Sequence, residues 1–172
     1  MAALYSEASA IKSILPDSDF PKTEEEARPA KPTGRLLALD LGAKRVGVAV
    51  CDELRLTTQP LPALARTNWK KLLRQISDLC HSFDARGVVI GLPFNLDGTE
   101  GEAALEARRV ARNLSLSLRV PVHLQDERLT SRAAEEFLRG AGVKGLELTA
   151  RLDSEAAALI LRDFIAGQER QP

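Results

Sequence analysis

The sequence Leu36-Leu37-Ala38-Leu39-Asp40-Leu41, followed after the turn Gly42-Ala43-Lys44 by Arg45-Val46-Gly47-Val48-Ala49-Val50, decides the fold. The first run is almost unbroken in apolar residues, which is typical of a strand buried on both faces of a sheet. The second run follows so closely that the two strands are expected to pair as an antiparallel hairpin. The first strand is therefore expected at the centre of a sheet.

Further strands and helices are predicted on the C-terminal side of this hairpin. A third strand is expected near residues 56–64, where Pro60 and Pro62 place it at the edge of the sheet. The remaining predicted elements are a helix over 68–83, a strand at 88–90, a helix over 100–118, a strand over 120–125, a helix over 131–139 and a last helix from Asp153 to about residue 166. The order β-β-β-α-β-α-β-α-α predicts an α/β fold with a five-stranded mixed sheet and helices on both faces. This is the element order of the RNase H-like fold.

The 172 residues are enough for one domain with a buried core. Residues 1–33 contain four prolines and an acidic run, so we expect a disordered N-terminal extension there, a folded domain over 34–168 and a tail over 169–172. A net charge of zero argues against a protein that coats nucleic acid without specificity, although a local basic patch is compatible with it. Neither a secretory signal nor a membrane-spanning run is visible, so a cytoplasmic protein without a membrane partner is expected.

Two aspartates stand where a carboxylate is chemically informative. Asp40 shares one strand face with Leu36 and Ala38, and a buried carboxylate is costly unless it is paired, protonated or bound to a metal. The alternative is a strand-end residue that accepts hydrogen bonds from the following turn. Asp153 shares the apolar face of the last predicted helix and should meet the sheet, but aspartate is also a favoured helix N-cap. The other members of that face are Ala157, Ile160, Leu161 and Phe164.

A third acidic group, Asp126-Glu127, stands where the fifth strand should end. Ligands gather at the carboxyl ends of strands in open α/β sheets, whereas the alternative is a solvated charge cluster next to Arg128. Strand alternation turns the two acids to opposite faces, so only one of them should reach a shared site. Carboxylates from three elements suit hard divalent cations, Mg²⁺ first and Mn²⁺ as the alternative, and such ions can activate water for phosphodiester cleavage.

Two other patterns are less informative. Residues 140–145 match G-x-G-x-x-G, but they follow a predicted helix instead of a strand, so a dinucleotide site is not expected. The three arginines Arg108, Arg109 and Arg112 on one helix indicate a solvated face, with phosphate contact as the alternative.

Four stretches together resemble the YqgF/RuvX family over residues 35–166. They are Leu39-Asp40-Leu41-Gly42-Ala43-Lys44-Arg45-Val46-Gly47-Val48-Ala49-Val50, Gly91-Leu92-Pro93-Phe94-Asn95-Leu96-Asp97-Gly98-Thr99, Asp126-Glu127-Arg128-Leu129-Thr130-Ser131 and Leu152-Asp153-Ser154-Glu155-Ala156-Ala157-Ala158-Leu159-Ile160-Leu161. The resemblance implies a metal-dependent nuclease of RNase H-like fold that matures the 5′ end of pre-16S ribosomal RNA. It also implies that Asp40, Glu127 and Asp153 are the catalytic, metal-holding acids, and that Asn95 contacts phosphate.

Cations near these acids should hold the nucleic acid. Lys44 and Arg45 follow the strand of Asp40, Arg128 follows Glu127, and Arg132 lies one turn into the next predicted helix. Three other functions stay open: cleavage of branched DNA at Holliday junctions, an actin-like ATPase, and a non-catalytic RNA-binding assembly factor. The ATPase is disfavoured because such proteins need two domains of this kind. The sequence does not predict the oligomeric state.

Overall fold

The computed structural model describes residues 33–95, 97–127 and 146–169, with side chains in the last range from Leu152 to Gln168. The expectations for residues 1–32, for the helix over 131–139, for residues 140–145 and for Arg128 and Arg132 lie outside the described residues. The described elements are β1 (Leu36–Leu41), β2 (Arg45–Cys51), β3 (Thr58–Ala65), α1 (Trp69–Ser82), β4 (Gly87–Leu92), α2 (Glu102–Ser117), β5 (Val122–Asp126) and α4 (Leu146–Glu169). None of the described helices is long and apolar enough to cross a membrane.

The strands form one sheet in the order β3-β2-β1-β4-β5. β1 pairs antiparallel with β2 and β2 with β3, whereas β1 pairs parallel with β4 and β4 with β5. The mixed, RNase H-like sheet predicted from the element order is confirmed, with β1 at its centre. The edge position expected for the strand with Pro60 and Pro62 is confirmed as well, since β3 is the outermost strand on its side.

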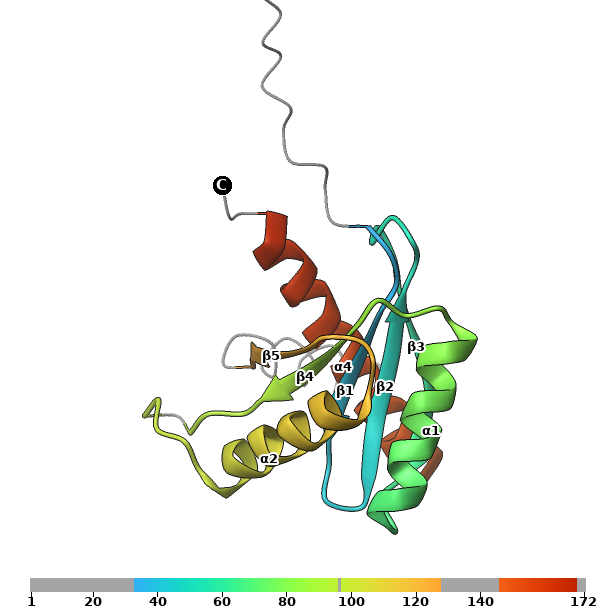
Figure 1. The fold of residues 1–172 in the computed structure, drawn as a ribbon. Helices are drawn as coiled ribbons and strands as arrows, with labels where there is room; N and C mark the ends of the chain where they lie inside the picture. Colours follow the sequence, from blue (N-terminus) through green and yellow to red (C-terminus); the bar gives the residue numbers. More distant parts are fainter. Residues whose placement is uncertain (1–32, 96, 128–145, 170–172) are drawn as a thin grey trace, which may run out of the picture. The chain divides into compact units, whose positions relative to one another are not determined.

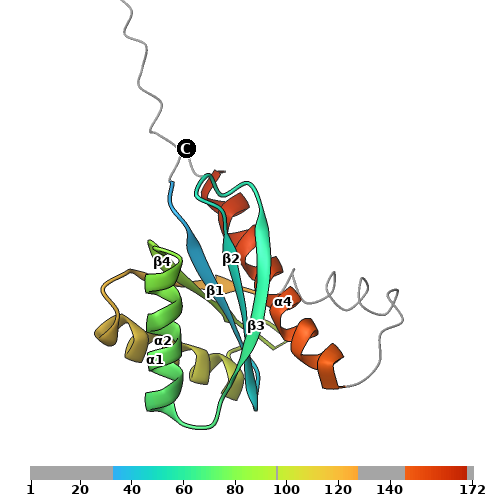
Figure 2. The same cartoon turned by 90° about the vertical axis from the view of Figure 1, so that its right-hand side faces the viewer.

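Helices cover both faces of the sheet, with α1 and α2 on one face and α4 on the other (Figure 1, Figure 2). Alternation along β1 divides its side chains between two cores. Leu37 and Leu39 pack with residues of α1 and α2, whereas Leu36 and Ala38 pack with α4. The core under α4 contains small residues, namely Ala38, Ala49, Ala157 and Ala158, all of them buried. A helix can therefore approach this face of the sheet closely.

The last helix begins at Leu146, so the prediction that it begins at Asp153 is wrong. Residues 146–152 are mostly strong helix formers, which carry the helix upstream of the capping signal. Asp153 thus lies inside α4, and its alternative role as the N-cap is also wrong. The predicted apolar face is confirmed: Ala157, Ile160 and Leu161 are buried, and Phe164 packs against the same core.

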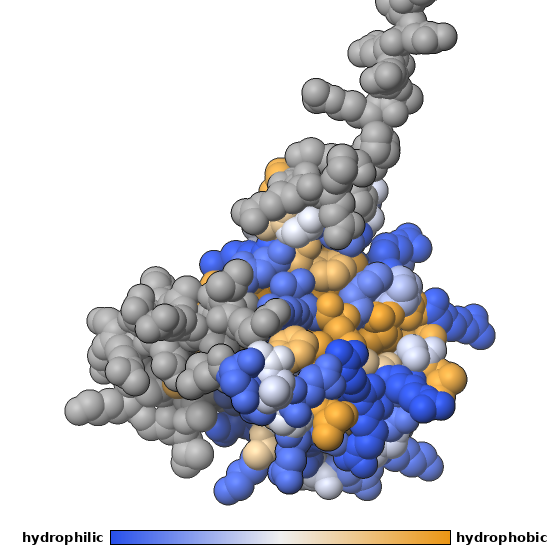
Figure 3. Space-filling view, turned by 90° about the vertical axis from the view of Figure 1, so that its left-hand side faces the viewer, coloured by the Kyte–Doolittle hydropathy of each residue, from blue (hydrophilic) through white to orange (hydrophobic). Residues whose placement is uncertain are grey.

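The edge of the sheet opposite to β3 is only partly covered. β5 forms the other edge of the sheet, its residues are only partly buried, and the space-filling view from this side shows polar and apolar side chains intermixed (Figure 3).

In the turn after β2, Arg55 has a positive φ of 59°. Its guanidinium donates to the Gly34 carbonyl at 2.9 Å, to the Thr33 carbonyl at 3.2 Å and to Gln168 Oε1 at 2.7 Å. Arg55 therefore joins the chain before β1 to the end of α4.

Candidate active site

Asp40 lies near the end of the central strand, on the face that α4 covers. It is in register with Gly47 of β2, and alternation turns it to the same side as Leu36 and Ala38. Burial, and then the negative charge of Asp153, raise the pKa of Asp40 from the ordinary 3.8 to about 6. The turn after β1 uses the main-chain oxygen of Asp40, which accepts from the Gly42 N–H at 3.2 Å. The Asp40 carboxyl is therefore a half-buried acid beside other acids.

Glu127 follows directly after β5. Its N–H donates to the Leu92 carbonyl at 3.2 Å, which extends the parallel pairing of β4 and β5 by one residue. A Cβ on Gly91 would overlap the Glu127 carboxyl, so the missing side chain at Gly91 provides the space that this acid occupies. Gly91 lies two residues after Val89, which belongs to the core under α4, so both residues are on the same face of the sheet. Glu127 thus lies on the same face as Asp40, and alternation turns Asp126 to the other face.

The pKa of Glu127 is raised from 4.5 to about 7. Burial is the largest cause, followed by the negative charges of Asp40 and then of Asp126. Asp40 is therefore electrostatically coupled to both of the other proposed catalytic acids, to Asp153 on α4 and to Glu127 after β5.

Asp153 reaches the same face from α4. A Cβ on Gly47 would overlap the main-chain carbonyl of Asp153, so the glycine allows the helix backbone to rest on the strand. The Asp153 carboxylate accepts from Arg45 Nε at 3.2 Å, and the next residue, Ser154, is buried and accepts from the Val48 N–H at 3.4 Å. These contacts fix the position of Asp153 along the length of β2.

The donor chemistry of this group fits a divalent cation. Carboxylate oxygens are the ligands that Mg²⁺ and Mn²⁺ prefer, and a cation would offset the mutual repulsion that contributes to the raised pKa values of Asp40 and Glu127. Within the three described ranges, no three acidic, histidine or cysteine side chains are close enough to form a ready-made metal site. Asp40, Glu127 and Asp153 are the residues that could hold an ion here, after a local adjustment of their side chains.

The described residues that were predicted to contact nucleic acid differ in how accessible their side chains are. Lys44 is exposed in the turn between β1 and β2, close to Asp40 in the chain. Arg45 is at the site, but its guanidinium is engaged by Asp153. The Asn95 amide donates to Thr99 Oγ1 at 2.9 Å and its main-chain N–H to the Thr99 carbonyl at 2.9 Å, so Asn95 closes the loop between β4 and α2. This is a structural role that the sequence did not predict.

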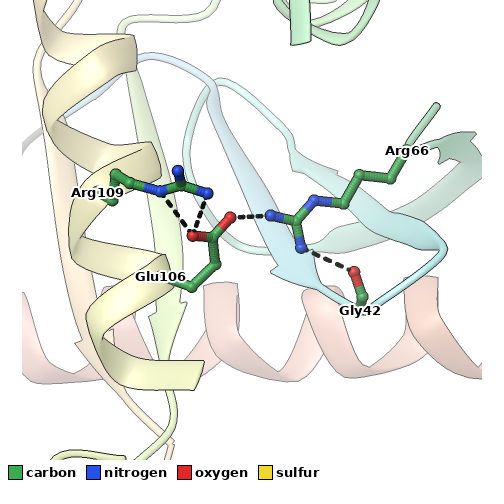
Figure 4. Close-up of polar contacts among 4 residues, drawn as sticks. All are labelled: Gly42, Arg66, Glu106 and Arg109. Carbon is green, nitrogen blue, oxygen red and sulfur yellow. Dashed lines mark hydrogen bonds and ion pairs between the residues drawn. The ribbon is translucent and has the colours of Figure 1, made fainter. Parts of the chain in front are cut away.

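Several contributors to the site were not singled out from the sequence. Gly47 and Gly91 stand inside buried strands, and a strand glycine is a general signal of close approach by another part of the chain. A third contributor is Arg66, which donates to the Gly42 carbonyl at 3.1 Å and contacts Glu106 of α2, which also contacts Arg109 (Figure 4). Such a bridge between distant residues has no signal in the sequence.

The chain is similar in sequence to a group of known proteins. The sequence matches the family profile described as RuvX, Holliday junction resolvase, over residues 34–167. A relative from Syntrophus aciditrophicus, provisionally named a pre-16S rRNA nuclease, is 42% identical over 140 residues, covering 80% of this chain and 93% of that protein. One of the same name from Anaeromyxobacter sp. strain K is 40% identical over 131 residues, covering 76% and 96%. Among solved structures, T. thermophilus RuvC in complex with a Holliday junction substrate has 19% identity and a TM-score of 0.49, covering 79% and 96%.

Proposed function

The chain belongs to the RuvX family, and from that premise we propose that it is a metal-dependent nuclease that cleaves a phosphodiester bond at the 5′ end of pre-16S ribosomal RNA. The substrate is supported by the provisional name of the relatives at 40% and 42% identity. A ribosomal RNA precursor as substrate also implies action in the cytoplasm. The observation that carries the proposal is that Asp40, Glu127 and Asp153 lie on one face of the sheet, with Asp40 electrostatically coupled to the other two.

The roles of the acids follow from their surroundings. Asp40 and Glu127 have pKa values of about 6 and about 7, so at neutral pH Asp40 is mostly a carboxylate and Glu127 is about half ionised. As carboxylates they can, with Asp153, bind Mg²⁺ or Mn²⁺ through oxygen. When bound, the ion supplies positive charge at the phosphate and activates water.

Cations beside the acids would position the RNA backbone. Arg45 orients the Asp153 carboxylate through its 3.2 Å contact, so its proposed role shifts from direct phosphate binding toward holding that acid in place. Lys44, exposed in the adjacent turn, is the better placed of the two for a phosphate. For Arg128 and Arg132, which lie outside the described residues, phosphate binding remains a proposal from the sequence.

Cleavage of Holliday junctions is the second candidate, favoured by the description of the family. The same acids would serve either substrate, so the choice must come from experiment. The full chain and Asp40→Asn should be incubated with a precursor 16S rRNA fragment and with a four-way DNA junction, with Mg²⁺, with Mn²⁺ and with a chelator. Metal-dependent cleavage of the RNA by the wild type, and no cleavage by Asp40→Asn, supports the proposal. Cleavage of the junction only would replace it with the resolvase, and binding of RNA without any cleavage would indicate an assembly factor.

A further inference from the structure

A hollow of about 260 Å³ lies between the start of α1 and the middle of α2, apart from the three acids. We call it the α1–α2 pocket. Its polar and aromatic lining is formed by Arg66, Asn68, Trp69, Glu106, Arg109 and Asn113. Its apolar floor is formed by Leu72 and Val110, which are buried. The lining is mostly polar, and the volume is just below the range of about 300–1,000 Å³ typical of small-molecule sites.

The charges in this pocket favour an anion. The Glu106 carboxylate contacts the guanidinium groups of both Arg66 and Arg109, so two positive charges share one negative charge (Figure 4). The side chain of Arg109 is 71% exposed, compared with 22% for Arg66, so Arg109 is the arginine that a ligand can reach. A planar guanidinium at the mouth of a pocket is well suited to a phosphate.

An aromatic ring lies beside these charges. Trp69 is the only tryptophan of the chain, and it remains 38% exposed at the first residue of α1. The first turn of α1 contains no acidic residue, although acids are favoured there by the helix dipole, and has the exposed residues Lys70 and Lys71 instead. The start of α1 therefore combines a flat aromatic surface with positive charge, which is the combination used to bind unpaired nucleotides.

The pocket is connected to the candidate active site. The Arg66 N–H donates to the Lys44 carbonyl at 2.9 Å, and its guanidinium donates to the Gly42 carbonyl at 3.1 Å. Both acceptors belong to the turn that follows Asp40 along the chain. The acids lie on the face that α4 covers and the pocket on the opposite face, so a strand of RNA with one phosphate at the acids would cross this turn to place a further nucleotide in the pocket.

We propose that the α1–α2 pocket binds one unpaired nucleotide of the RNA, with its base against Trp69 and its phosphate at Arg109. The pocket volume suits one base better than a complete cofactor, and the amides of Asn68 and Asn113 are polar groups that can meet its edge. The inference rests on the proposed function, because it takes RNA as the substrate. It adds a second point of attachment, which would select RNA with a single-stranded segment that extends from the cleaved bond.

The single tryptophan provides a direct test. A short single-stranded RNA is titrated into the full-length Asp40→Asn protein, so that cleavage does not interfere, and the fluorescence of Trp69 is followed. We expect saturable quenching. With a dye-labelled RNA and anisotropy detection, Trp69→Ala should weaken binding about tenfold and Trp69→Phe less, since a stacked base contributes about that much or more. Arg109→Ala should weaken binding and reduce the salt slope of log affinity by about 0.7.

Arg119→Ala is the matched control, because Arg119 is exposed but lines a different hollow, at the other end of α1 and α2. It should bind RNA as the parent does, and melting temperatures should show that all variants are folded. Unchanged fluorescence, or affinity of folded Trp69→Ala within twofold of the parent, overturns the proposal. So does a free nucleoside monophosphate that quenches Trp69 without competing with RNA, because the pocket would then serve a small molecule. If quenching occurs and the wild type cleaves no RNA, the pocket stands and the proposed nuclease fails.

Discussion

Replacing Asp40 by asparagine should make the protein more stable at neutral and alkaline pH while it removes the proposed activity. Burial, and then the charge of Asp153, raise the pKa of Asp40 from 3.8 to about 6, so the folded state disfavours its charged form. The difference between the two pKa values corresponds to about 3 kcal/mol of unfolding free energy. Asparagine keeps the size of the side chain and carries no charge, so it should recover up to this amount.

The direction of the effect depends on pH. Because the folded protein holds the Asp40 proton more tightly than the unfolded chain does, this group favours folding below pH 3.8, and that contribution is lost as the pH rises to about 6. Wild type and Asp40→Asn should therefore be similarly stable at about pH 4, where the wild-type carboxyl is mostly protonated. Above pH 6 to 7 the variant should be more stable, with a melting temperature higher by roughly 6–12 °C for a chain of this size.

Urea unfolding followed by circular dichroism, repeated between about pH 4 and about pH 8, measures this difference. Mg²⁺ should stabilise the wild type at the upper pH and the variant much less, because an ion bound only by the folded state raises stability. Asp52→Asn is the matched control: hydrogen bonds from Thr57 lower the pKa of exposed Asp52, so its replacement should not stabilise the protein at any pH. If Asp40→Asn is no more stable than the wild type at high pH, the carboxylate is not strained by its neighbours and our reasoning is wrong.

Three further predictions concern the geometry around the acids. Glu127→Gln should slow single-turnover cleavage by at least about a hundredfold, and Asp126→Asn much less, because alternation turns Asp126 to the other face; a larger loss from Asp126→Asn reverses the assignment. Gly91→Ala should displace the Glu127 carboxyl and reduce the cleavage rate more than the melting temperature, whereas Gly167→Ala, where a Cβ meets nothing within 4 Å, should leave the rate unchanged. Gly47→Ala should press on the α4 backbone and lower the unfolding free energy by at least about 1–3 kcal/mol in urea titrations, and full stability would contradict the close packing described here.

Local sequence patterns, each spanning only a few residues, predicted most of the fold. The apolar run around Asp40 identified the central strand, because a strand buried on both faces is apolar along its whole length. The prolines near residue 60 identified the edge strand, because proline lacks the N–H that an inner strand needs for pairing on both sides. The start of the last helix was predicted wrongly because the capping signal at Asp153 was given more weight than the strong helix formers at residues 146–152, which extend the helix upstream. Contacts such as those of Arg66 with Glu106 join residues far apart in sequence, which no local pattern can predict.

The Arg55 contacts have a practical consequence for experiments on this protein. They bring the start of the domain, Thr33 and Gly34, together with Gln168 near its end. Asp40 lies near the far end of β1, and Asp153 lies 15 residues before Gln168, or about 22 Å along α4. Both ends of the domain, near Thr33 and near Gln168, are thus remote from the acids. An affinity tag, a fluorescent label or a surface linker joined at either end of the domain, next to Thr33 or Gln168, should leave the proposed RNA path open, so the domain can be immobilised from that side for single-molecule cleavage measurements.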